Sequence, residues 1–293
     1  MSGRLWLDGE PVDGLVAVQV TNANGETLIA RTASIGTPAG SAGIEILGVT
    51  PCDQNGIPKD TFKREVEDAH VNITVKNNDV VSHEVLITVC TYDNDSSPII
   101  KDAKTSSIRE TIPPNGTIQF KPLIPIYSWV STGFAAFHAN VYTDWPKNGG
   151  YPYTAEKSAT FRIVPKSGGA SASSEYQQSA TSESDDPYNM TFRLPPSAVY
   201  GAPFGEYSIN VSAYALGYRG HSSRTFSREF QIDGDVNFDH GVGILDLVLV
   251  TSIYGLQGGS GSHLWDPARD VQPNGKIDIL DVVVITSKYG QTY

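Results

Sequence analysis

Two loops near the end of the sequence place oxygen-bearing groups at the spacing of a metal-binding loop. In the first loop, positions 1, 3, 5, 7 and 12 are Asp235, Asn237, Asp239, Gly241 through its carbonyl, and Asp246. In the second loop, the same positions are Asp270, Gln272, Asn274, Lys276 through its carbonyl, and Asp281. Ca²⁺ takes six to eight oxygen ligands, and a 12-residue loop supplies them from these positions. The sequence therefore predicts two calcium sites.

The two loops belong to an internal repeat. The segment from Ile244 to Gly255 recurs as the segment from Ile279 to Gly290. Each copy is a short apolar run that ends in glycine, which predicts a helix with a glycine C-cap. Both loops have an apolar residue at position 8, Val242 or Ile277, through which we expect the paired loops to form a short β contact. Acidic solvated turns could explain one such loop, but a duplicate in register favours metal binding.

The segment from Asp233 to Tyr293 resembles a type I dockerin, with one helix per loop and Asp at position 12. The resemblance implies that the loops bind Ca²⁺ and that the duplicated face binds a cohesin module on a scaffold or surface protein. The implied partner-binding positions are Ile244, Leu245, Ile279 and Leu280. These positions are usually polar in cellulosomal dockerins, so the apolar pairs could instead pack on the β-rich part of this chain.

Two departures from the dockerin pattern affect the expected sites. His240 stands at position 6 of the first loop, where glycine is usual, which strains the turn unless Gly241 takes the unusual dihedral angle. Gln272 and Asn274 reduce the negative charge of the second loop, so we expect it to bind Ca²⁺ more weakly.

Upstream of the repeats, apolar and polar residues alternate in short runs that predict β-strands. Residues 15–20 and 27–31 flank Asn24-Gly25, which predicts a hairpin with a two-residue turn. Further strands are predicted at residues 69–76, 84–91, 117–121, 135–142, 158–164, 188–194, 205–214 and 224–232. Between them, residues 166–186 are rich in Ser, Gly and acidic residues and predict a mobile linker.

The segment before residue 35 and the segment after residue 187 each contain too few strands to form a closed sandwich. Together they have the size of one Ig-like domain. Gly9–Gly14 and Gly205–Ser212 resemble the two halves of a macroglobulin-type Ig-like domain. Val71–Asn78, Ile112–Gly116 and Ala139–Tyr142 resemble a CARDB-type sandwich. Together with the dockerin-like segment, these resemblances imply a prokaryotic, and specifically an archaeal, cell-surface protein.

The expected fold is mainly β, with one Ig-like sandwich inserted into another and a small helical dockerin-like module. The predicted domains are residues 1–42 with 187–232, the inserted residues 43–165, the linker 166–186 and the module 233–293.

Composition limits the function. The net charge of −11 argues against binding to nucleic acid or to an anionic membrane surface. No apolar run is long enough for a membrane-spanning helix, and a leader peptide is not evident, although one could have been removed. Sequons for N-glycosylation occur at Asn72, Asn94, Asn115, Asn189 and Asn210. We expect an extracellular or cell-surface protein.

Other residues leave alternatives open. Cys52 and Cys90 could form one disulfide or remain as two buried thiols. The turn at residues 92–98 has oxygen ligands for another cation, or is simply a polar turn. The candidate sugar-stacking rings, which could equally fill the core, are Tyr127, Trp129, Trp145, Tyr151 and Tyr153.

No spacing of the six histidines, and no nucleophile or phosphate-binding motif, predicts catalysis. We therefore expect a non-enzymatic structural or adhesive protein in a surface assembly or self-assembling filament. Its expected partners are copies of itself or a cohesin-like module. In a filament, residues 5–34 of one subunit could complete residues 188–232 of the next. The alternative is a carbohydrate-binding module, with polysaccharide as its ligand, docked to a cohesin-bearing scaffold.

Overall fold

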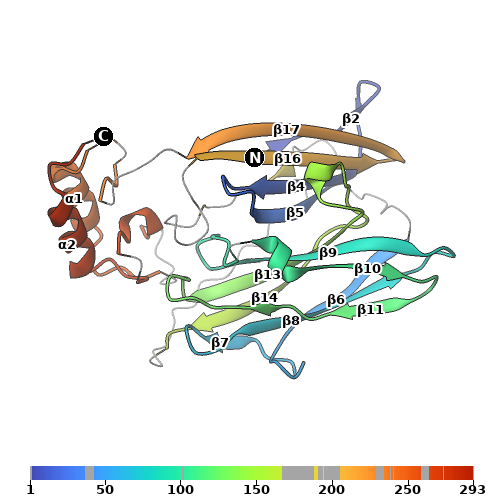
Figure 1. Cartoon of the computed structure of the whole chain (residues 1–293), viewed down its shortest axis with the longest axis horizontal. Helices are drawn as coiled ribbons and strands as arrows, with labels where there is room; N and C mark the ends of the chain where they lie inside the picture. The colour runs from blue at the N-terminus through green and yellow to red at the C-terminus, as the bar shows by residue number, and fades with distance from the viewer. Residues whose placement is uncertain are drawn as a thin grey trace.

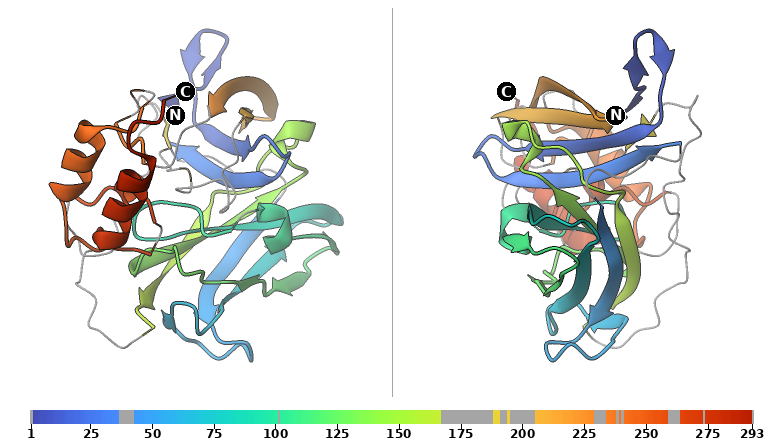
Figure 2. Two further views of the ribbon diagram at one scale, coloured as in Figure 1. Left: turned by 60° about the vertical axis from the view of Figure 1, so that its left-hand side comes forward. Right: turned by 90° about the vertical axis from the view of Figure 1, so that its right-hand side faces the viewer.

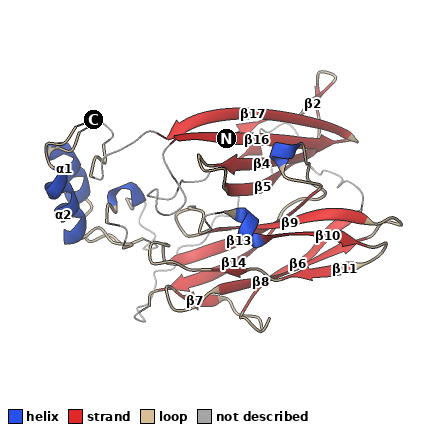
Figure 3. Ribbon diagram, in the orientation of Figure 1, coloured by secondary structure: helices blue, strands red, loops and turns tan. Residues whose placement is uncertain are grey.

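The described residues are mainly β, and they include two α-helices near the C-terminal end (Figure 3). The structure is a computed structural model and describes residues 2–36, 43–100, 102–166, 188–190, 194, 205–228, 234–237, 239, 241–258, 264–272 and 274–292. Three larger sheets lie in layers, and the helices lie at one end of the longest axis (Figure 1).

The central layer is a five-stranded sheet. In spatial order it contains β10 (Ser107–Ile112), β9 (His83–Tyr92), β13 (Gly133–Tyr142), β14 (Lys157–Val164) and β7 (Thr61–Lys63). One outer sheet contains β11 (Thr117–Phe120), β12 (Leu123–Ile124) and β6 (Ile44–Cys52), all paired with β8 (Ala69–Asn77). The other outer sheet contains β17 (Tyr218–Arg228), β16 (Gly205–Ala215), β4 (Gly14–Thr21) and β5 (Thr27–Ile35).

The remaining elements are short. They are the pair β1 (Ser2–Gly3) and β15 (Tyr188–Asn189), the pair β2 (Trp6–Leu7) and β3 (Glu10–Pro11), and the 3₁₀ turns η1 (Ala103–Ser106), η2 (Pro146–Asn148) and η4 (Pro267–Arg269).

The central sheet is buried on both faces. Val85, Ile87 and Val89 of β9 enter the core shared with β8, whereas Leu86 and Cys90 enter the core shared with β4 and β5. Successive side chains of a strand point to opposite faces, so a strand covered on both sides must be apolar almost throughout. In contrast, β8 alternates between buried and half-buried residues because only one of its faces is covered.

The upper sheet in Figure 1 is built from both ends of the described β region. The central strand β4 pairs antiparallel with β16, so that Val18 lies opposite Val211. Segments far apart in the sequence thus share one sheet within the same chain. Strand exchange between subunits would have to replace this pairing.

The predicted β4–β5 hairpin is confirmed, but the predicted two-residue turn is wrong. The Asn22 side-chain oxygen accepts hydrogen bonds from the backbone N–H groups of Asn24 and Glu26, at 3.0 and 2.9 Å. Of the residues in the turn, Gly25 alone has positive φ, at 78°. The side chain of Asn22 therefore organises a longer turn that needs one left-handed residue instead of two.

Most other predicted strands are present with slightly different ends. The two predicted strands that differ most, at residues 188–194 and 224–232, come after the predicted linker. Strand β15 covers only the start of the predicted strand at 188–194, and β17 begins before residue 224. Residues 191–193 and 229–232 lie outside the described part, as does the predicted linker apart from residue 166.

The two cysteines form no disulfide. Both are free and buried. Cys52 ends β6 in an outer sheet, whereas the Cys90 thiol faces β5 on the opposite side of the central sheet, where it donates to the Ala30 carbonyl at 3.3 Å. Of the two alternatives, the structure therefore has the two buried thiols, because the side chain of Cys90 points away from the sheet that holds Cys52.

The repeat forms the two helices α1 (Ile244–Thr251) and α2 (Ile279–Lys288). Gly290 follows the cap residue of α2 with φ of 83°, as the glycine signal predicts. Helix α1 ends earlier, and turns lead from it to Gly255. Neither helix is long and apolar enough to cross a membrane, nor is any other helix of the described residues.

Candidate functional site

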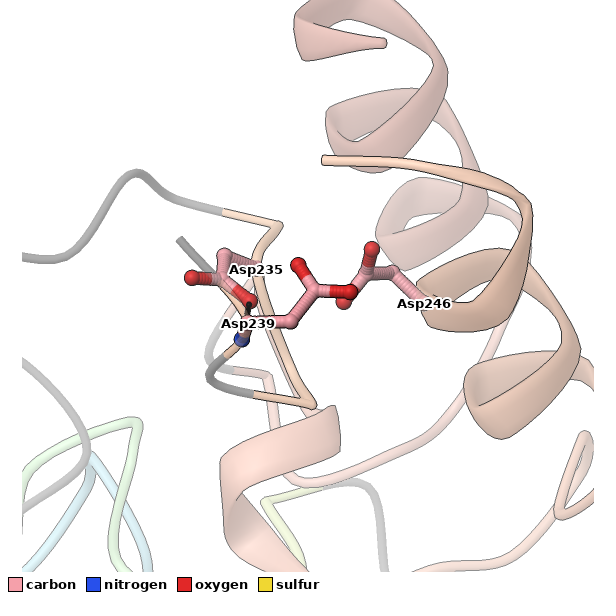
Figure 4. Close-up of side chains that lie close together, drawn as sticks. All are labelled: Asp235, Asp239 and Asp246. Atoms are coloured by element: carbon pink, nitrogen blue, oxygen red, sulfur yellow. Dashed lines mark hydrogen bonds between the residues drawn. The ribbon is translucent and has the colours of Figure 1, made fainter. Parts of the chain in front are cut away.

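The first loop brings three of its predicted ligands together. The carboxylates of Asp235, Asp239 and Asp246 each have an oxygen within 4.8 Å of the others. Figure 4 shows that Asp235 and Asp239 come from the loop, whereas Asp246 reaches them from the first turn of α1. Among the described residues, this is the one group of three or more acidic, His or Cys side chains close enough to share a metal ion.

Backbone hydrogen bonds hold Asp246 in place. One oxygen accepts from the N–H groups of Val236 and Asn237 at 2.8 and 3.1 Å, and the other accepts from Gly243 at 2.7 Å. Because Gly243 is the N-cap of α1, the carboxylate fixes the start of the helix as well as the loop.

The second loop repeats this arrangement. Asp281 accepts from the N–H groups of Gln272 and Asp278, at 2.9 and 2.7 Å. Asp270 accepts from Asn274 and Gly275, at 3.1 and 2.8 Å. The two loops therefore fold alike, although the second has fewer acidic ligands.

Burial dominates the electrostatics of the second loop. It raises the pKa of Asp270 to about 7, against the opposing effect of the two backbone donors. Burial also raises the pKa of Asp281. Both carboxyls therefore lie where ionisation is costly without a nearby positive charge.

The predicted contact between the two position-8 residues is wrong. Val242 exchanges backbone hydrogen bonds with the turn after α2, donating to Gln291 and accepting from Gly290 at 2.9 and 2.8 Å. Ile277 does the same with Gly255 and Leu256 after α1, at 2.8 and 2.9 Å. Each loop thus pairs with the end of the other unit's helix, and this reciprocal pairing ties the two units together.

The glycine positions differ between the loops. Gly275, at position 6 of the second loop, has φ of 80°, as the sharp turn requires. Gly241 does not have positive φ and so does not take over this role in the first loop. His240 itself lies outside the described residues.

The predicted partner-binding residues are exposed. Ile244, Leu245, Ile279 and Leu280 are between 47% and 59% accessible. They do not pack on the β sheets, so the alternative that they cover the chain's own β region is corrected. With Val248 and Val283, each 53% exposed, they form what we call the helical face. Their burial would require a partner from outside the described chain.

The helical module is attached to the β sheets by specific polar contacts. The indole N–H of Trp265 donates to Asp95 at 2.7 Å. The Thr132 hydroxyl donates to the Gly258 carbonyl at 3.2 Å. The sequence does not predict this contact. Its one sign is the oxygen-rich composition of the turn at residues 92–98, which contains Asp95 but does not indicate its partner.

Arg64 completes the contact. Its guanidinium donates to the Val130 carbonyl at 3.1 Å and lies so close to Gly275 that a Cβ there would be 2.7 Å from Nη1. Burial lowers the pKa of Arg64, while Glu65 and Asp270 oppose this effect. A cation from the β region therefore lies beside the second loop.

The aromatic residues proposed to bind sugar do not form an exposed platform. Trp129, Trp145 and Tyr153 are 5%, 8% and 7% exposed and belong to the cores. Tyr127 is 38% exposed and stacks on Trp129, and Tyr151 stacks on Tyr214. The rings mainly fill cores and brace loops.

The sequons differ in accessibility. Asn115 is exposed on a turn, and Asn72 and Asn94 are half-buried. Asn210 is 8% exposed within β16, which makes its modification in the folded protein unfavourable. The side-chain environment of Asn189 lies outside the described part of the chain.

The described histidines do not cluster. His138 is buried with Glu156 and His83 pairs with Asp79, while His70 and His221 lie on separate strands. His240 and His263 lie outside the described residues.

No protein-family model matches the chain, and no curated protein matches it. Solved structures do match. The C-terminal domain of wzt has a TM-score of 0.34 at 10% identity, covering 44% of this chain and 77% of its own. The CARDB domain of a Pyrococcus furiosus protein has a TM-score of 0.28 at 12% identity, covering 44% and 95%. A Niemann-Pick type C2 protein from the Japanese carpenter ant has a TM-score of 0.29 at 13% identity, covering 44% and 99%.

Proposed function

We propose that the protein is a non-enzymatic, calcium-stabilised component of an extracellular or cell-surface assembly. In this proposal its β sheets form two Ig-like sandwiches, one inserted into the other. Its C-terminal segment acts as a dockerin-like module that binds a protein partner through the helical face. The observation that carries the proposal is the reciprocal pair of loop-helix units, which combines buried loop carboxylates with exposed apolar helix residues.

The chemistry of the first loop fits Ca²⁺. Its donors are oxygens, which hard cations prefer, and the group contains no Cys or His that would favour zinc. Asp235 and Asp246 are fully buried, and such carboxylates close together are stabilised by a shared cation. Asp270 and Asp281 of the second loop would hold a second, weaker ion.

Calcium would act structurally. Each position-12 carboxylate also accepts from the N-cap residue of its helix. An ion in the loop would therefore stabilise the orientation of both helices and of the face they present.

The helical face fits an apolar protein surface. On α1 the sole ionisable side chain, Asp246, is fully buried, and on α2 Asp281 is fully buried while Lys288 lies in the last turn, away from the first turn that holds Ile279 and Leu280. The exposed part of the face is therefore almost uncharged, as expected for the centre of a protein interface. The carbohydrate-binding alternative receives less support, because its proposed tryptophans are buried.

Calcium titration of the full chain by calorimetry tests the proposal. We expect two binding events, and Asp235→Asn should weaken one of them by about tenfold or more because a ligand charge is lost. At a free Ca²⁺ concentration 100 times Kd, each site should stabilise the fold by about 2.7 kcal/mol. A chelator should therefore lower the melting temperature and speed amide exchange in α1 and α2.

Asp266→Asn is the matched control. Asp266 caps η4 outside the ligand positions, and asparagine keeps an acceptor for the Ala268 N–H. This variant should retain both binding events. Absence of calcium binding, or amide exchange in the helices that a chelator leaves unchanged, would contradict the proposal.

A further inference from the structure

The second loop is part of the contact between the helical module and the β sheets. The Gly275 carbonyl accepts a hydrogen bond from the Gly258 N–H at 3.0 Å, and the Gly258 carbonyl accepts from the Thr132 hydroxyl at 3.2 Å. On its other side, the Gly275 N–H donates to the Asp270 carboxylate at 2.8 Å. Figure 1 and the left view of Figure 2 both show the helices beside one end of the β sheets. A short series of hydrogen bonds therefore connects a predicted calcium ligand with the β sheets.

Arg64 reaches the same turn of the loop from the β side. Its backbone N–H donates to the carbonyl of Val164, the last residue of β14, at 3.0 Å, and its guanidinium donates to the Val130 carbonyl at 3.1 Å. The same Nη1 atom lies 2.7 Å from the position that a Cβ at Gly275 would take. The guanidinium therefore rests against the backbone of the loop, and moving it away would break its bond to Val130.

The charge of Arg64 acts on a predicted calcium ligand. Arg64 is attracted by the carboxylates of Glu65 and Asp270. Glu65 is exposed, so water screens its charge more than that of the half-buried Arg64. A positive charge that is attracted to Asp270 repels any cation that Asp270 binds.

The composition of the second loop makes it sensitive to such a charge. It has two acidic residues at ligand positions, whereas the first loop has three. A neighbouring guanidinium therefore cancels a larger share of the negative charge that attracts Ca²⁺ to the second loop.

We propose that Ca²⁺ binding in the second loop and attachment of the helical module to the β sheets oppose each other, with Arg64 as the residue that couples them. The inference rests on the proposed calcium binding and adds its regulation. In the attached arrangement, Arg64 supplies positive charge beside Asp270. Ca²⁺ in the loop makes that position of the guanidinium unfavourable, so it weakens the contact that Gly275 makes with the β side.

Thermodynamic linkage makes the effect reciprocal. If attachment weakens calcium binding by a given factor, calcium binding weakens attachment by the same factor, and such couplings are commonly about 5–150-fold. The first loop pairs with Gly290 and Gln291 of its own module, so an ion there stabilises the helices directly. Rising calcium should therefore first order the helices through the first loop and then, through the second loop, release the module from its fixed orientation.

Calorimetric titration of the full chain tests the role of Arg64. The Asp235→Asn background weakens the first loop, so that the binding event of the second loop can be followed. In this background Arg64→Gln removes the charge but keeps an N–H donor for the Val130 carbonyl, and it should tighten calcium binding by about fivefold or more. Arg64→Lys keeps the charge and should retain the affinity of the parent chain.

Lys63→Gln is the matched control. It removes the same charge from the adjacent residue, which is exposed at the end of β7. Because water screens an exposed charge, this variant should bind calcium within about twofold of the parent affinity. Tightening in Arg64→Gln alone therefore reports the position of the charge and not the net charge of the chain.

Amide hydrogen exchange with and without calcium gives a second readout. In the wild type, calcium should slow exchange in α2 and accelerate it at residues 95–97 and 130–132, which lie at the contact. General stabilisation by an ion would slow exchange in both places. In Arg64→Gln the calcium-dependent acceleration should disappear, whereas a purely structural role of Arg64 would alter exchange equally with and without calcium.

The outcomes separate this inference from the proposal on which it rests. Equal calcium affinities in Arg64→Gln and Lys63→Gln, or slower exchange at residues 130–132 of the wild type when calcium is added, would overturn the coupling and leave the calcium sites intact. A wild-type chain that binds no calcium would overturn both. If thermal melting shows that Arg64→Gln does not fold, the direction of the wild-type exchange response decides the question.

Discussion

At the residue scale, one buried ion cluster joins the central sheet to the sheet made from both ends of the β region. Arg31 donates to both oxygens of Glu156, at 2.6 and 2.7 Å, and His138 Nδ1 lies 2.8 Å from the same carboxylate. Burial alone would raise the pKa of Glu156, but Arg31 and His138 outweigh it and hold the pKa well below its usual range. The carboxylate therefore stays ionised between the two layers.

Replacing Glu156 by Gln should destabilise the protein by about 3–5 kcal/mol, because Arg31 would remain buried without its counter-charge. Urea unfolding at neutral pH measures the change. Glu84→Gln is the control, since Glu84 pairs with Arg109 on the surface and such pairs contribute at most about 1 kcal/mol. Equal effects of the two substitutions would show that the buried cluster is not a main stabiliser of the layer contact.

The clustering of the loop carboxylates could be predicted from the sequence because a repeat preserves the spacing of its acidic residues. The structure brings Asp235, Asp239 and Asp246 together as the spacing indicates. The partner of Trp265 could not be predicted, because Asp95 is distant in sequence and no local pattern marks a hydrogen bond between separate elements. The choice between a disulfide and two free thiols stayed open for a related reason, since it depends on which face of β9 the Cys90 side chain takes.

At the element scale, the turn after β9 joins the helical module to the β sheets. Asp93 accepts hydrogen bonds from the N–H groups of Asp95, Ser97 and Ser131, at 3.1, 3.0 and 3.0 Å. The Asp95 carboxylate accepts from the Ser131 hydroxyl and from Trp265. One short turn therefore orders both a loop of the central sheet and the neighbouring module.

Asp93 should make stability depend on pH. Burial, and then the charge of Asp95, raises the pKa of Asp93 to about 7, whereas the ordinary value is 3.8. The folded protein thus keeps a proton that the unfolded chain loses, so stability should fall as pH rises from about 4 to about 7, by at most about 4 kcal/mol. Asp93→Asn should flatten this slope in urea unfolding across that range, while lowering stability because the amide nitrogen cannot accept from Ser131. An unchanged slope would contradict this assignment.

Trp265→Phe should loosen the module. An aromatic six-membered ring is retained, but the hydrogen bond to the Asp95 carboxylate is lost, which should cost about 1.5–3 kcal/mol, and the smaller side chain leaves part of the core unfilled. Amide exchange should accelerate at residues 95–97 and 131–132 and in the module itself. Trp6→Phe is the control, because Trp6 is exposed and belongs to β2, which lies at the opposite end of the molecule from α1 and α2 (Figure 1). Identical exchange in wild type and Trp265→Phe would mean that other contacts hold the module.

Strand positions were largely predictable because alternation records which face is covered. The strand β9, which is covered on both faces, was also predicted within one residue at each end, whereas contacts that are not local were not predicted. Sequence patterns gave no sign that Val242 would pair with the turn after α2 instead of with Ile277. The pairing of one loop with a distant turn depends on how the two loop-helix units pack together. A short stretch of sequence carries no information about that packing.

At the scale of the whole molecule, two outer sheets pack on opposite faces of the central sheet, and the helical module is attached at one end. The orientation of the helical face relative to the β sheets is therefore set by contacts as well as by the chain connection.

The pairing of β4 with β16 has a consequence for biosynthesis. A ribosome completes β4 and β5 long before it reaches residues 205–215, whereas the strands from β6 to β14 emerge in between and can already assemble with one another. The nascent chain must therefore hold an unfinished sheet, with the edge of β4 open, until residues 205–215 have been synthesised. During that interval this edge is exposed to neighbouring chains on the same messenger, and chaperones that shield it should increase the yield of correctly folded protein.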